Sequence, residues 1–433
     1  MADFDISRDD GLKNVLSKTH AGAKCRLCNG ALSTTFLDLG MSPLCESTLS
    51  ADQIDQMEPY FPLRVLVCDN CFLVQLREYV KPENIFSEYI YFSSYSTSWV
   101  EHARRYCEMI QRRLALGRHS QVFEVASNDG YLLQHFVRMG IPATGIEPAV
   151  NVAAVAREKN IETIVEFFGV NLARRLTSEG KRADLIAGNN VLAQVPDLND
   201  FVGGMAILLG PDGVITLEFP HLERLIDGNQ FDTIYHEHFS YFSFVTIDRL
   251  AKRHALRVFD VEHLPTHGGS LRAYLCHSSA SHAQSPSVDA LLLHERQKGF
   301  EDIRIYATFS AQVHQTKRRL LSFLIGLKDK GARLCGYGAP GKGNTLLNYC
   351  GIGVDFLDFT VDRNPHKHGL YTPGMHIPIR PVSAIDDARP DYLLILPWNL
   401  KKEIIEQMRY VSEWGCKFIV AIPEIEVIDP REP

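Results

Sequence analysis

The segment YHEHFSY, residues 235–241, gathers side chains that can hold and transfer protons. An imidazole changes its protonation near neutral pH, and a neighbouring phenol or carboxylate can orient it or share in the transfer. The spacing is not the HExxH of zinc proteases, because Ser240 stands where the second histidine would be. The segment therefore predicts at least one acid or base role within the cluster formed by Tyr235, His236, Glu237, His238 and Tyr241. Glu237 could instead only orient a neighbouring donor.

Four cysteines form two CxxC pairs near the N-terminus, Cys25 with Cys28 and Cys68 with Cys71. Two residues between thiolates let one tight turn present both sulfurs to a metal, and two such turns close a tetrahedral shell that suits Zn²⁺. A redox CxxC is the competing interpretation, but it does not explain two pairs. A closed four-sulfur shell leaves no position for water, so we expect a structural zinc ion.

The stretch VFEVASNDGYLLQHF, residues 122–136, reads as a strand, a short turn and a helix. Such a turn lets a ligand approach the backbone at the start of the helix, near the carboxyl edge of a sheet. Glu124 lies near the strand end, and Ser127, Asn128 and Gly130 belong to the turn. Glu124 has a plainer interpretation as a carboxylate that stabilises the turn.

Polar residues also follow the later strands of this region. Glu147 can accept the two ribose hydroxyls of an adenosine, and Asn189 and Asn190 end a further strand. The chain thus shows a turn after the first strand, an acidic residue after the second, asparagines after the third, and a further strand after LGPDG. This order is similar to that of class I S-adenosylmethionine methyltransferases. A nicotinamide-binding fold shares only the turn and the acidic residue. The residues expected to bind the donor are Glu124, Ser127, Asn128, Gly130, Tyr131, Glu147, Pro148, Phe168, Asn189 and Asn190.

A glycine-rich segment, GYGAPGKGNT at residues 336–345, follows a strand in the C-terminal third. It is not a Walker A motif, GxxxxGK[ST], which requires Ser or Thr directly after the lysine; here Asn344 is two residues after Lys342. Glycine-rich backbone at a helix start binds phosphate, and Lys342 adds charge, so the segment predicts a diphosphate or sugar contact. A tight turn that packs strand on helix is the alternative. The residues expected to bind substrate are His267, Arg272, Lys342, Asn344 and Asn399.

The elements that position these groups fall into three segments, because 433 residues are too many for one hydrophobic core. Residues 1–85 hold both cysteine pairs, and residues 86–288 alternate apolar strands with helical stretches. Residues 289–433 show helical periodicity and then short strands. We predict an α/β protein with a zinc-binding domain (1–85), a Rossmann-like methyltransferase domain (86–288) and a second Rossmann-like domain (289–433) that contributes to substrate binding.

Composition narrows the class of protein. The net charge is −7, whereas nucleic-acid binders usually carry a basic surplus. No apolar run approaches the roughly 20 residues of a membrane helix, and the polar N-terminus lacks the features of a signal peptide. We therefore expect a cytoplasmic monomer that acts on a small molecule, without nucleic-acid or membrane partners. Ten cysteines in that compartment are not expected to form disulfides.

The longer motifs resemble those of the sugar C-methyltransferases that act on nucleotide-linked 4-keto-6-deoxyhexoses. The shared strings are the CxxC pairs, SNDGYLLQ, GIEPA, NNVLAQVPD, EFPHL, QFDTIYHEHFSYFS, LPTHGGSLR, GYGAPGKGNTLLNY and LPWNL. The resemblance covers almost the whole chain, and long strings of polar residues do not recur by chance. It implies S-adenosylmethionine as cofactor, structural zinc, and methylation at C3 of the sugar through an enolate.

The same resemblance implies roles for individual side chains. His238 is the base that removes the proton next to the ketone, with Tyr235 and Glu237 beside it and Tyr89 reaching the same site. Members of the family commonly carry His where this chain has Gln194, which points to His238 as the sole imidazole base.

Three alternatives remain open from the sequence. Methylation at C5 of a related sugar follows the same enolate logic, and neither the methylated carbon nor the nucleotide base can be read from the residues. A nicotinamide-dependent oxidoreductase would use GYGAPG for its cofactor. A zinc-dependent nucleic-acid-binding module is the alternative outside enzymes, and the acidic net charge argues against it.

Overall fold

The computed structural model describes residues 22–81 and 92–431, and its contacts separate the chain into two compact units. Each unit is built from stretches that are far apart in the sequence. Of the described residues, unit 1 comprises 22–33, 68–81, 92–221 and 239–303, and unit 2 comprises 34–67, 222–238 and 304–431. These units cross the predicted domain boundaries at 85 and 288, so the three-domain division stays a prediction.

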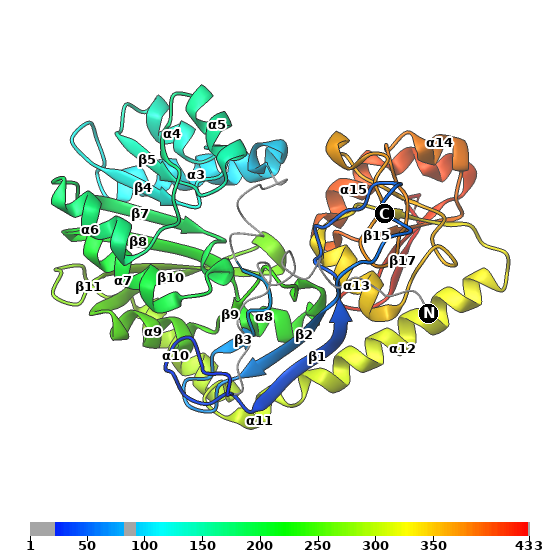
Figure 1. Cartoon of the computed structure of the whole chain (residues 1–433), viewed down its shortest axis with the longest axis horizontal. Helices are drawn as coiled ribbons and strands as arrows, with labels where there is room; N and C mark the ends of the chain where they lie inside the picture. The colour runs from blue at the N-terminus through cyan, green and yellow to red at the C-terminus, as the bar shows by residue number, and fades with distance from the viewer. Residues whose placement is uncertain (1–21, 82–91, 432–433) are drawn as a thin grey trace, which may run out of the picture. The chain divides into compact units, whose positions relative to one another are not determined.

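Unit 1 contains a seven-stranded sheet in the order β10-β11-β8-β7-β4-β5-β6 (Figure 1). The five strands from β8 to β6 are parallel, and β11 runs antiparallel to both of its neighbours. Ligands of such open sheets bind beyond the carboxyl ends of the strands, where the strand order reverses, which here is around β4. The strands are β4 (Val122–Val125), β5 (Ala143–Ile146), β6 (Glu162–Ile164), β7 (Ala183–Asn189), β8 (Leu209–Pro220), β10 (Leu256–Leu264) and β11 (Ser270–His277).

Helices cover both faces of this sheet, and alternate side chains of the strands separate its core into two clusters. Leu185 of β7 packs in one cluster and Ile186 in the other. The first cluster takes side chains from α3 (Thr97–Arg113), α4 (Leu133–Arg138) and α5 (Val150–Glu158). The second takes side chains from α6 (Val170–Ser178), α7 (Leu198–Leu208), α9 (Phe244–Arg253) and α10 (Pro286–Lys298).

The helix α10 shows why the predicted boundary at 288 differs from the observed grouping. Ser285 caps its first turn, Pro286 begins it, and Gly299 ends it in a left-handed conformation. Val288 and Leu291 are buried in the same cluster as α7 and α9. The serine-rich stretch before Pro286 is a loop, but the helix after it still belongs to unit 1.

Two similar turns carry the paired cysteines of unit 1. In each turn the residue after the second cysteine, Asn29 or Phe72, has a positive φ, and its amide donates to the carbonyl of the first cysteine. The second turn leads into β3 (Val74–Leu76), which pairs antiparallel with β9 (Ser240–Tyr241). The strand that follows the catalytic candidates in sequence is thus paired with the strand that follows the second cysteine turn.

Unit 2 contains a six-stranded sheet in the order β14-β13-β12-β15-β16-β17, parallel except for β17. It confirms the second α/β fold. The antiparallel pair β1 (Thr34–Ser42) and β2 (Phe61–Val67) also belongs to this unit. The strands of the sheet are β12 (Leu334–Tyr337), β13 (Thr360–Val361), β14 (Ile379–Arg380), β15 (Tyr392–Ile395), β16 (Lys417–Val420) and β17 (Glu426–Ile428). The remaining α-helices are α8 (Leu222–Asp227), α11 (Ile303–Tyr306), α12 (Phe309–Lys328), α13 (Gly341–Cys350), α14 (Ala384–Ala388) and α15 (Lys401–Gln407).

The stretch 222–238, which carries the acid and base candidates, belongs to unit 2, although the chain before and after it belongs to unit 1. We call this stretch the excursion. The residues that flank it remain in unit 1: His221 forms a parallel bridge with Phe242, and its amide donates to the carbonyl of Gly269. The excursion therefore starts and ends at neighbouring points of the backbone.

None of the helices in the described residues combines the length and the hydropathy needed to cross a membrane.

Candidate active site

The four predicted zinc ligands lie together in unit 1. The sulfur atoms of Cys25, Cys28, Cys68 and Cys71 all lie within 4.8 Å of one another. Cys25 Sγ is 3.4 Å from Cys71 Sγ, and Cys28 Sγ is 3.5 Å from Cys68 Sγ. Disulfide sulfurs are about 2.05 Å apart, whereas four sulfurs at about 2.3 Å from a tetrahedral zinc are about 3.8 Å apart. The arrangement fits a zinc ion and not a pair of disulfides.

Neighbouring groups complete the surroundings of these sulfurs. Gln75 Nε2 donates to Cys25 Sγ at 3.2 Å, and Asn70 Nδ2 donates to Cys28 Sγ at 3.5 Å. A Cβ atom at Gly30 would lie 3.3 Å from Cys28 Sγ, so the backbone passes close to the sulfur there. Donors of this kind stabilise negative thiolates and orient them toward a metal.

The predicted donor turn has the backbone of a tight ligand-binding loop. Ala126, Asn128 and Gly130 all have positive φ. A Cβ atom on Gly130 would lie 2.3 Å from Ile161 Cδ1, so this position requires glycine for both conformation and space. The turn directly follows the carboxyl end of β4, and its residues Ser127, Asn128 and Asp129 are buried.

The carboxylate of Glu147 joins this turn to the end of β5. Its Oε2 accepts from the Asn128 amide at 2.9 Å, and its Oε1 accepts from the Ala149 amide at 2.9 Å. Each oxygen keeps a second lone pair, so a ribose contact remains a prediction. Burial raises the pKa of Glu124 well above its usual range, and the carboxylates of Glu147 and Asp129 raise it further.

Several buried polar atoms around the turn lack a hydrogen-bond partner within the described residues. They are Oγ of Ser127 and the side-chain amide atoms of Asn189 and Asn190. Buried polar groups are normally paired, and a cluster of unpaired ones at the carboxyl ends of β4 and β7 indicates a place for a polar ligand. A nucleoside with ribose hydroxyls and ring nitrogens fits this donor and acceptor set.

The other residues expected to contact the methyl donor have more apolar surroundings. Tyr131 is buried and stacks on Trp99 with ring centroids 6.0 Å apart. Phe168 is half-buried and makes an edge contact with Phe201, and Pro148 is half-buried after β5. Trp99, which the sequence did not single out, also stacks on His102 at 5.0 Å.

In unit 2 the ring of His238 is oriented by the chain just before it. Its Nδ1 donates to the carbonyl of Thr233 at 2.9 Å, and its ring lies 4.0 Å from that of Tyr235, centroid to centroid. A carbonyl can only accept, so Nδ1 carries the proton and the lone pair of the neutral ring is on Nε2. Both side chains are half-buried.

The neighbours of His238 have different surroundings. Glu237 is buried, and its Oε1 accepts from the Cys45 thiol at 3.6 Å. His236 is buried against Phe61, and its Nε2 lies 3.3 Å from the carbonyl of Pro62. Burial lowers the pKa of His236 to about 4, so this ring is neutral at physiological pH.

The glycine-rich segment packs closely against protein. A Cβ atom on Gly341 would lie 2.8 Å from Cys45 Sγ. Asn344 Nδ2 donates to the carbonyl of Cys45, and Thr345 Oγ1 donates to that of Ile234 at 3.0 Å. The segment thus braces the stretch that carries His238, which favours the packing alternative for its glycines.

Lys342 is directed into this unit. Its Nζ is buried without a hydrogen-bond partner in the described residues and lies 5.0 Å from the ring centroid of Trp398. Burial lowers its pKa, and Asp232 opposes that shift. The indole of Trp398 donates to Asp232 Oδ2 at 2.7 Å, while Asn399 is exposed. Sugar-nucleotide contacts by Lys342, Asn344 and Asn399 remain predictions.

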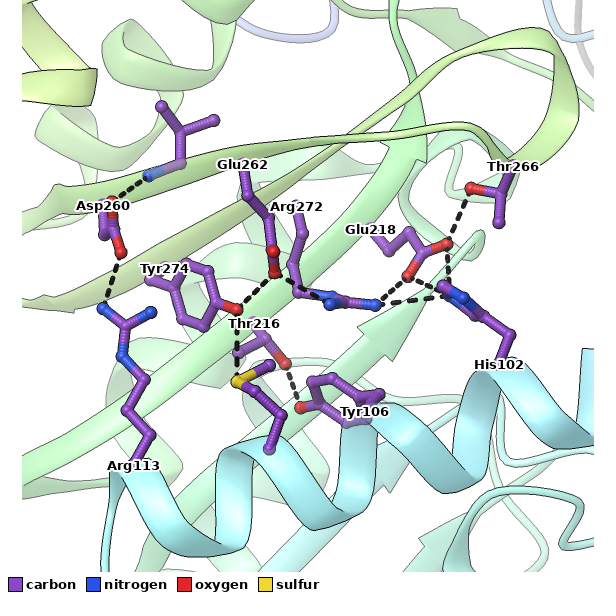
Figure 2. A network of polar contacts seen from close by, with 12 residues as sticks. His102, Tyr106, Arg113, Thr216, Glu218, Asp260, Glu262, Thr266, Arg272 and Tyr274 are labelled. Atoms are coloured by element: carbon purple, nitrogen blue, oxygen red, sulfur yellow. Dashed lines mark hydrogen bonds and ion pairs between the residues drawn. The ribbon is translucent and has the colours of Figure 1, made fainter.

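Arg272 lies in a buried network of unit 1 (Figure 2). Its guanidinium is 2.6 Å from Glu218 Oε2 and 2.8 Å from Glu262 Oε1. His102 Nε2 is 3.0 Å from both oxygens of Glu218, and Thr266 Oγ1 donates to one of them. Burial opposes ionisation of Glu218, yet His102 and Arg272 hold its pKa at about 2. Arg272 is therefore engaged by protein carboxylates, which favours a structural role.

This network reaches the end of β7 through the backbone. The carbonyl of Glu218, near the end of β8, accepts from the Asn190 amide at 2.7 Å. His267, another expected substrate contact, has a positive φ and makes an edge contact with Trp99. Tyr89 lies outside the described residues.

The chain matches three family models in succession. Residues 25–86 match one described as "Putative zinc binding domain", residues 99–261 one described as "Methyltransferase domain", and residues 265–423 one described as "C-methyltransferase C-terminal domain". C-methyltransferase NovU of Streptomyces niveus is 35% identical over 405 residues, which cover 94% of this chain and 96% of that protein. The chain belongs to the C-methyltransferase family. This C-methyltransferase uses S-adenosylmethionine and has a zinc-binding domain that holds the four cysteines.

Two solved structures each match less than half of this C-methyltransferase. The PH0226 protein of Pyrococcus horikoshii has a TM-score of 0.36 and 16% identity, and the match covers 45% of this chain and 97% of that one. Magnesium protoporphyrin IX methyltransferase of Synechocystis, solved with bound SAM, has a TM-score of 0.31 and 14% identity, with 41% and 81% covered.

Proposed function

We propose that this enzyme methylates C3 of a nucleotide-diphosphate 4-keto-6-deoxyhexose, with His238 as the base. Membership of the C-methyltransferase family establishes carbon as the acceptor. A carbon next to a ketone becomes a nucleophile when it loses a proton, so the reaction needs a positioned base. The sugar class comes from the motif resemblance, and the position C3 comes with it.

The hydrogen bond from His238 Nδ1 to the Thr233 carbonyl is the observation that carries the assignment of the base. It fixes the tautomer in which Nε2 accepts a proton, and it stabilises the imidazolium that forms. His236, two residues earlier, is buried with a pKa lowered to about 4 and is poorly suited to hold a proton. Of the two histidines in the cluster, His238 is the one suited to the role.

The remaining residues bind, orient and exclude water. S-adenosylmethionine supplies an electrophilic methyl group. Glu147 and the backbone of the turn at Asn128 would hold its ribose, and Asn189 and Asn190 would pair with its polar atoms. The phenol of Tyr235, packed on the His238 ring, can donate to the oxyanion that develops on the ketone.

Hydrogen exchange tests the base without the methyl transfer. In D₂O, without donor, the wild-type enzyme should exchange the C3 hydrogen of a 4-keto-6-deoxyhexose nucleotide for deuterium, as followed by NMR. His238→Gln should lose this exchange and about 10²–10⁴-fold in kcat. Its affinity for S-adenosylhomocysteine, measured by calorimetry, should stay at the wild-type value, because the base does not bind the donor.

Two outcomes would change the assignment. Exchange that persists in His238→Gln but not in Tyr235→Phe would make Tyr235 the base. Exchange at C5 in place of C3 would move the reaction to the other side of the ketone.

A further inference from the structure

Arg26, between the first two cysteines, reaches away from the sulfurs and holds a distant stretch of chain. Its Nη1 donates to the carbonyl of Phe239 at 2.5 Å and to Ser240 Oγ at 3.3 Å, and its Nη2 donates to the carbonyl of Leu76 at 2.8 Å. The guanidinium carbon also lies 5.4 Å from the ring centroid of Phe239. One side chain thus joins the cysteine turn to both strands of the β3–β9 pair.

The backbone of Arg26 is itself fixed. Its amide donates to Gln75 Oε1 at 3.0 Å, and Gln75 Nε2 donates to Cys25 Sγ. Gln75 is also paired in register with Ser240 across the strands. Asn199 Nδ2 donates to the Arg26 carbonyl at 2.7 Å. Hydrogen bonds therefore hold both the backbone and the guanidinium of Arg26.

Phe239 follows His238 directly, so the position of Phe239 fixes the backbone on the C-terminal side of His238. The Phe239 amide donates to the carbonyl of Ala193, and its carbonyl accepts from the Leu76 amide as well as from Arg26. A guanidinium adds charge-assisted bonds, which are stronger than those between neutral groups. Loss of Arg26 would leave the carbonyl with its backbone partner alone.

We propose that Arg26 is a positioning residue, which clamps Phe239 and Ser240 so that the ring of His238 stays in its reactive orientation. This rests on His238 as the base in the proposed function. It also gives the zinc-binding turn a role in catalysis, because the turn that carries the sulfurs also carries the clamp. Misplacing a catalytic group by about 1 Å can cost about 10²-fold in rate.

Arg249 provides a matched control on the second cysteine turn. Its Nη1 donates to the carbonyl of Asn70 at 3.2 Å, its guanidinium lies over the ring of Phe72, and it pairs with Glu301. It braces a zinc-binding turn, as Arg26 does, but these contacts do not involve Phe239 or Ser240.

The experiment compares Arg26→Met, Arg26→Lys and Arg249→Met in the full-length zinc-loaded enzyme. Arg26→Met should keep one zinc per chain and wild-type affinity for S-adenosylhomocysteine, while kcat falls roughly 10- to 100-fold with a smaller change in KM. Arg26→Lys should retain part of the rate, and Arg249→Met should retain all of it. Arg26 also lines a cavity of about 790 Å³, so added guanidinium ions should restore part of the rate of Arg26→Ala.

A spectroscopic measurement separates this proposal from the assignment of the base. ¹⁵N NMR of the imidazoles, with the His238 signals identified by their loss in His238→Gln, should show a mixed tautomer only in the Arg26 variants. Unchanged His238 signals and unchanged kcat in Arg26→Met would overturn the clamp, whatever the fate of the base assignment. Loss of zinc from Arg26→Met would also overturn it, because Arg26 would then serve the metal site.

Discussion

At the scale of single residues, the two histidines of the YHEHFSY segment show that identical side chains suit different roles when their burial and hydrogen bonds differ. His238 is half-buried and oriented through Nδ1, whereas His236 is enclosed beside Phe61. The sequence identified the cluster because acid and base side chains rarely stand so close together. The family resemblance named His238, but the spacing alone did not rank the two rings, because the burial of His236 depends on β2, which lies far away in the chain.

His236 should make stability depend on pH in a defined direction. Its pKa in the folded chain is about 4, below the value of about 6.5 in an unfolded chain, so its contribution is fully present above pH 6.5 and is lost as the pH falls toward 4. The stability difference between wild type and His236→Gln should shrink by up to about 3 kcal/mol over that range. Urea unfolding at several pH values measures this.

An exposed histidine serves as the control for this series. His366→Gln should leave the free energy of unfolding unchanged, because the side chain is exposed. Parallel pH curves for wild type and His236→Gln would contradict the prediction. A selective loss of turnover in His236→Gln would assign His236 a catalytic role instead.

Arg26 and Glu218 also show what sequence patterns miss. Residues between the cysteines of a CxxC pair are normally part of the turn alone, and nothing in the pattern marks Arg26 as a long-range donor. Glu218 belongs to the motif EFPHL, yet its ion pairs depend on β11 and α3. Such contacts follow from tertiary packing and not from local spacing.

At the scale of elements, the donor turn was the feature that the sequence predicted best. The strand, the turn and the helix near 122–136 appear where the pattern placed them, because each rests on local signals. The glycine-rich turn at 336–345 was harder to interpret. Glycine permits both ligand approach and close packing, and here Gly341 lies against Cys45.

Gly130→Ala should damage the donor turn beyond the cost of a positive φ. The new methyl group meets Ile161 Cδ1 at 2.3 Å in a buried environment, whereas Gly140, also with positive φ, has nothing within 4 Å. Gly140→Ala should lose about 1–2 kcal/mol, and Gly130→Ala about 1–3 kcal/mol more. Thermal unfolding checks the stabilities. Only Gly130→Ala should weaken S-adenosylhomocysteine binding; equal affinities in both variants would place the donor elsewhere.

At the scale of the whole molecule, the zinc-binding turns are part of the core of unit 1. Cys25, Cys68 and Cys71 belong to the same hydrophobic cluster as the central sheet and α7. The sequence predicted the metal site from the spacing of its cysteines, because two CxxC pairs are a local signal. Each unit combines stretches that are far apart in the chain, and this grouping depends on tertiary packing, which local patterns do not carry.

Removal of zinc should therefore destabilise unit 1 and not only a local finger. The purified protein should contain one zinc per chain, and Cys68→Ser should lose it and lower Tm by about 5 °C or more, since 1 kcal/mol corresponds to about 2–4 °C. Cys416→Ser, at a buried cysteine outside the cluster, should keep the zinc. A protein that is free of zinc yet as stable as the loaded form would contradict the prediction.

The excursion at 222–238 has a consequence for how such enzymes diversify. Because His221 and Phe242 are bridged, the stretch between them starts and ends at one place on the scaffold. The two points where this stretch joins the scaffold are already adjacent. Recombination can therefore replace the stretch with little added loop-closure entropy. A relative's stretch, grafted between His221 and Phe242, would carry its own proton-transfer groups onto an unchanged methyltransferase sheet.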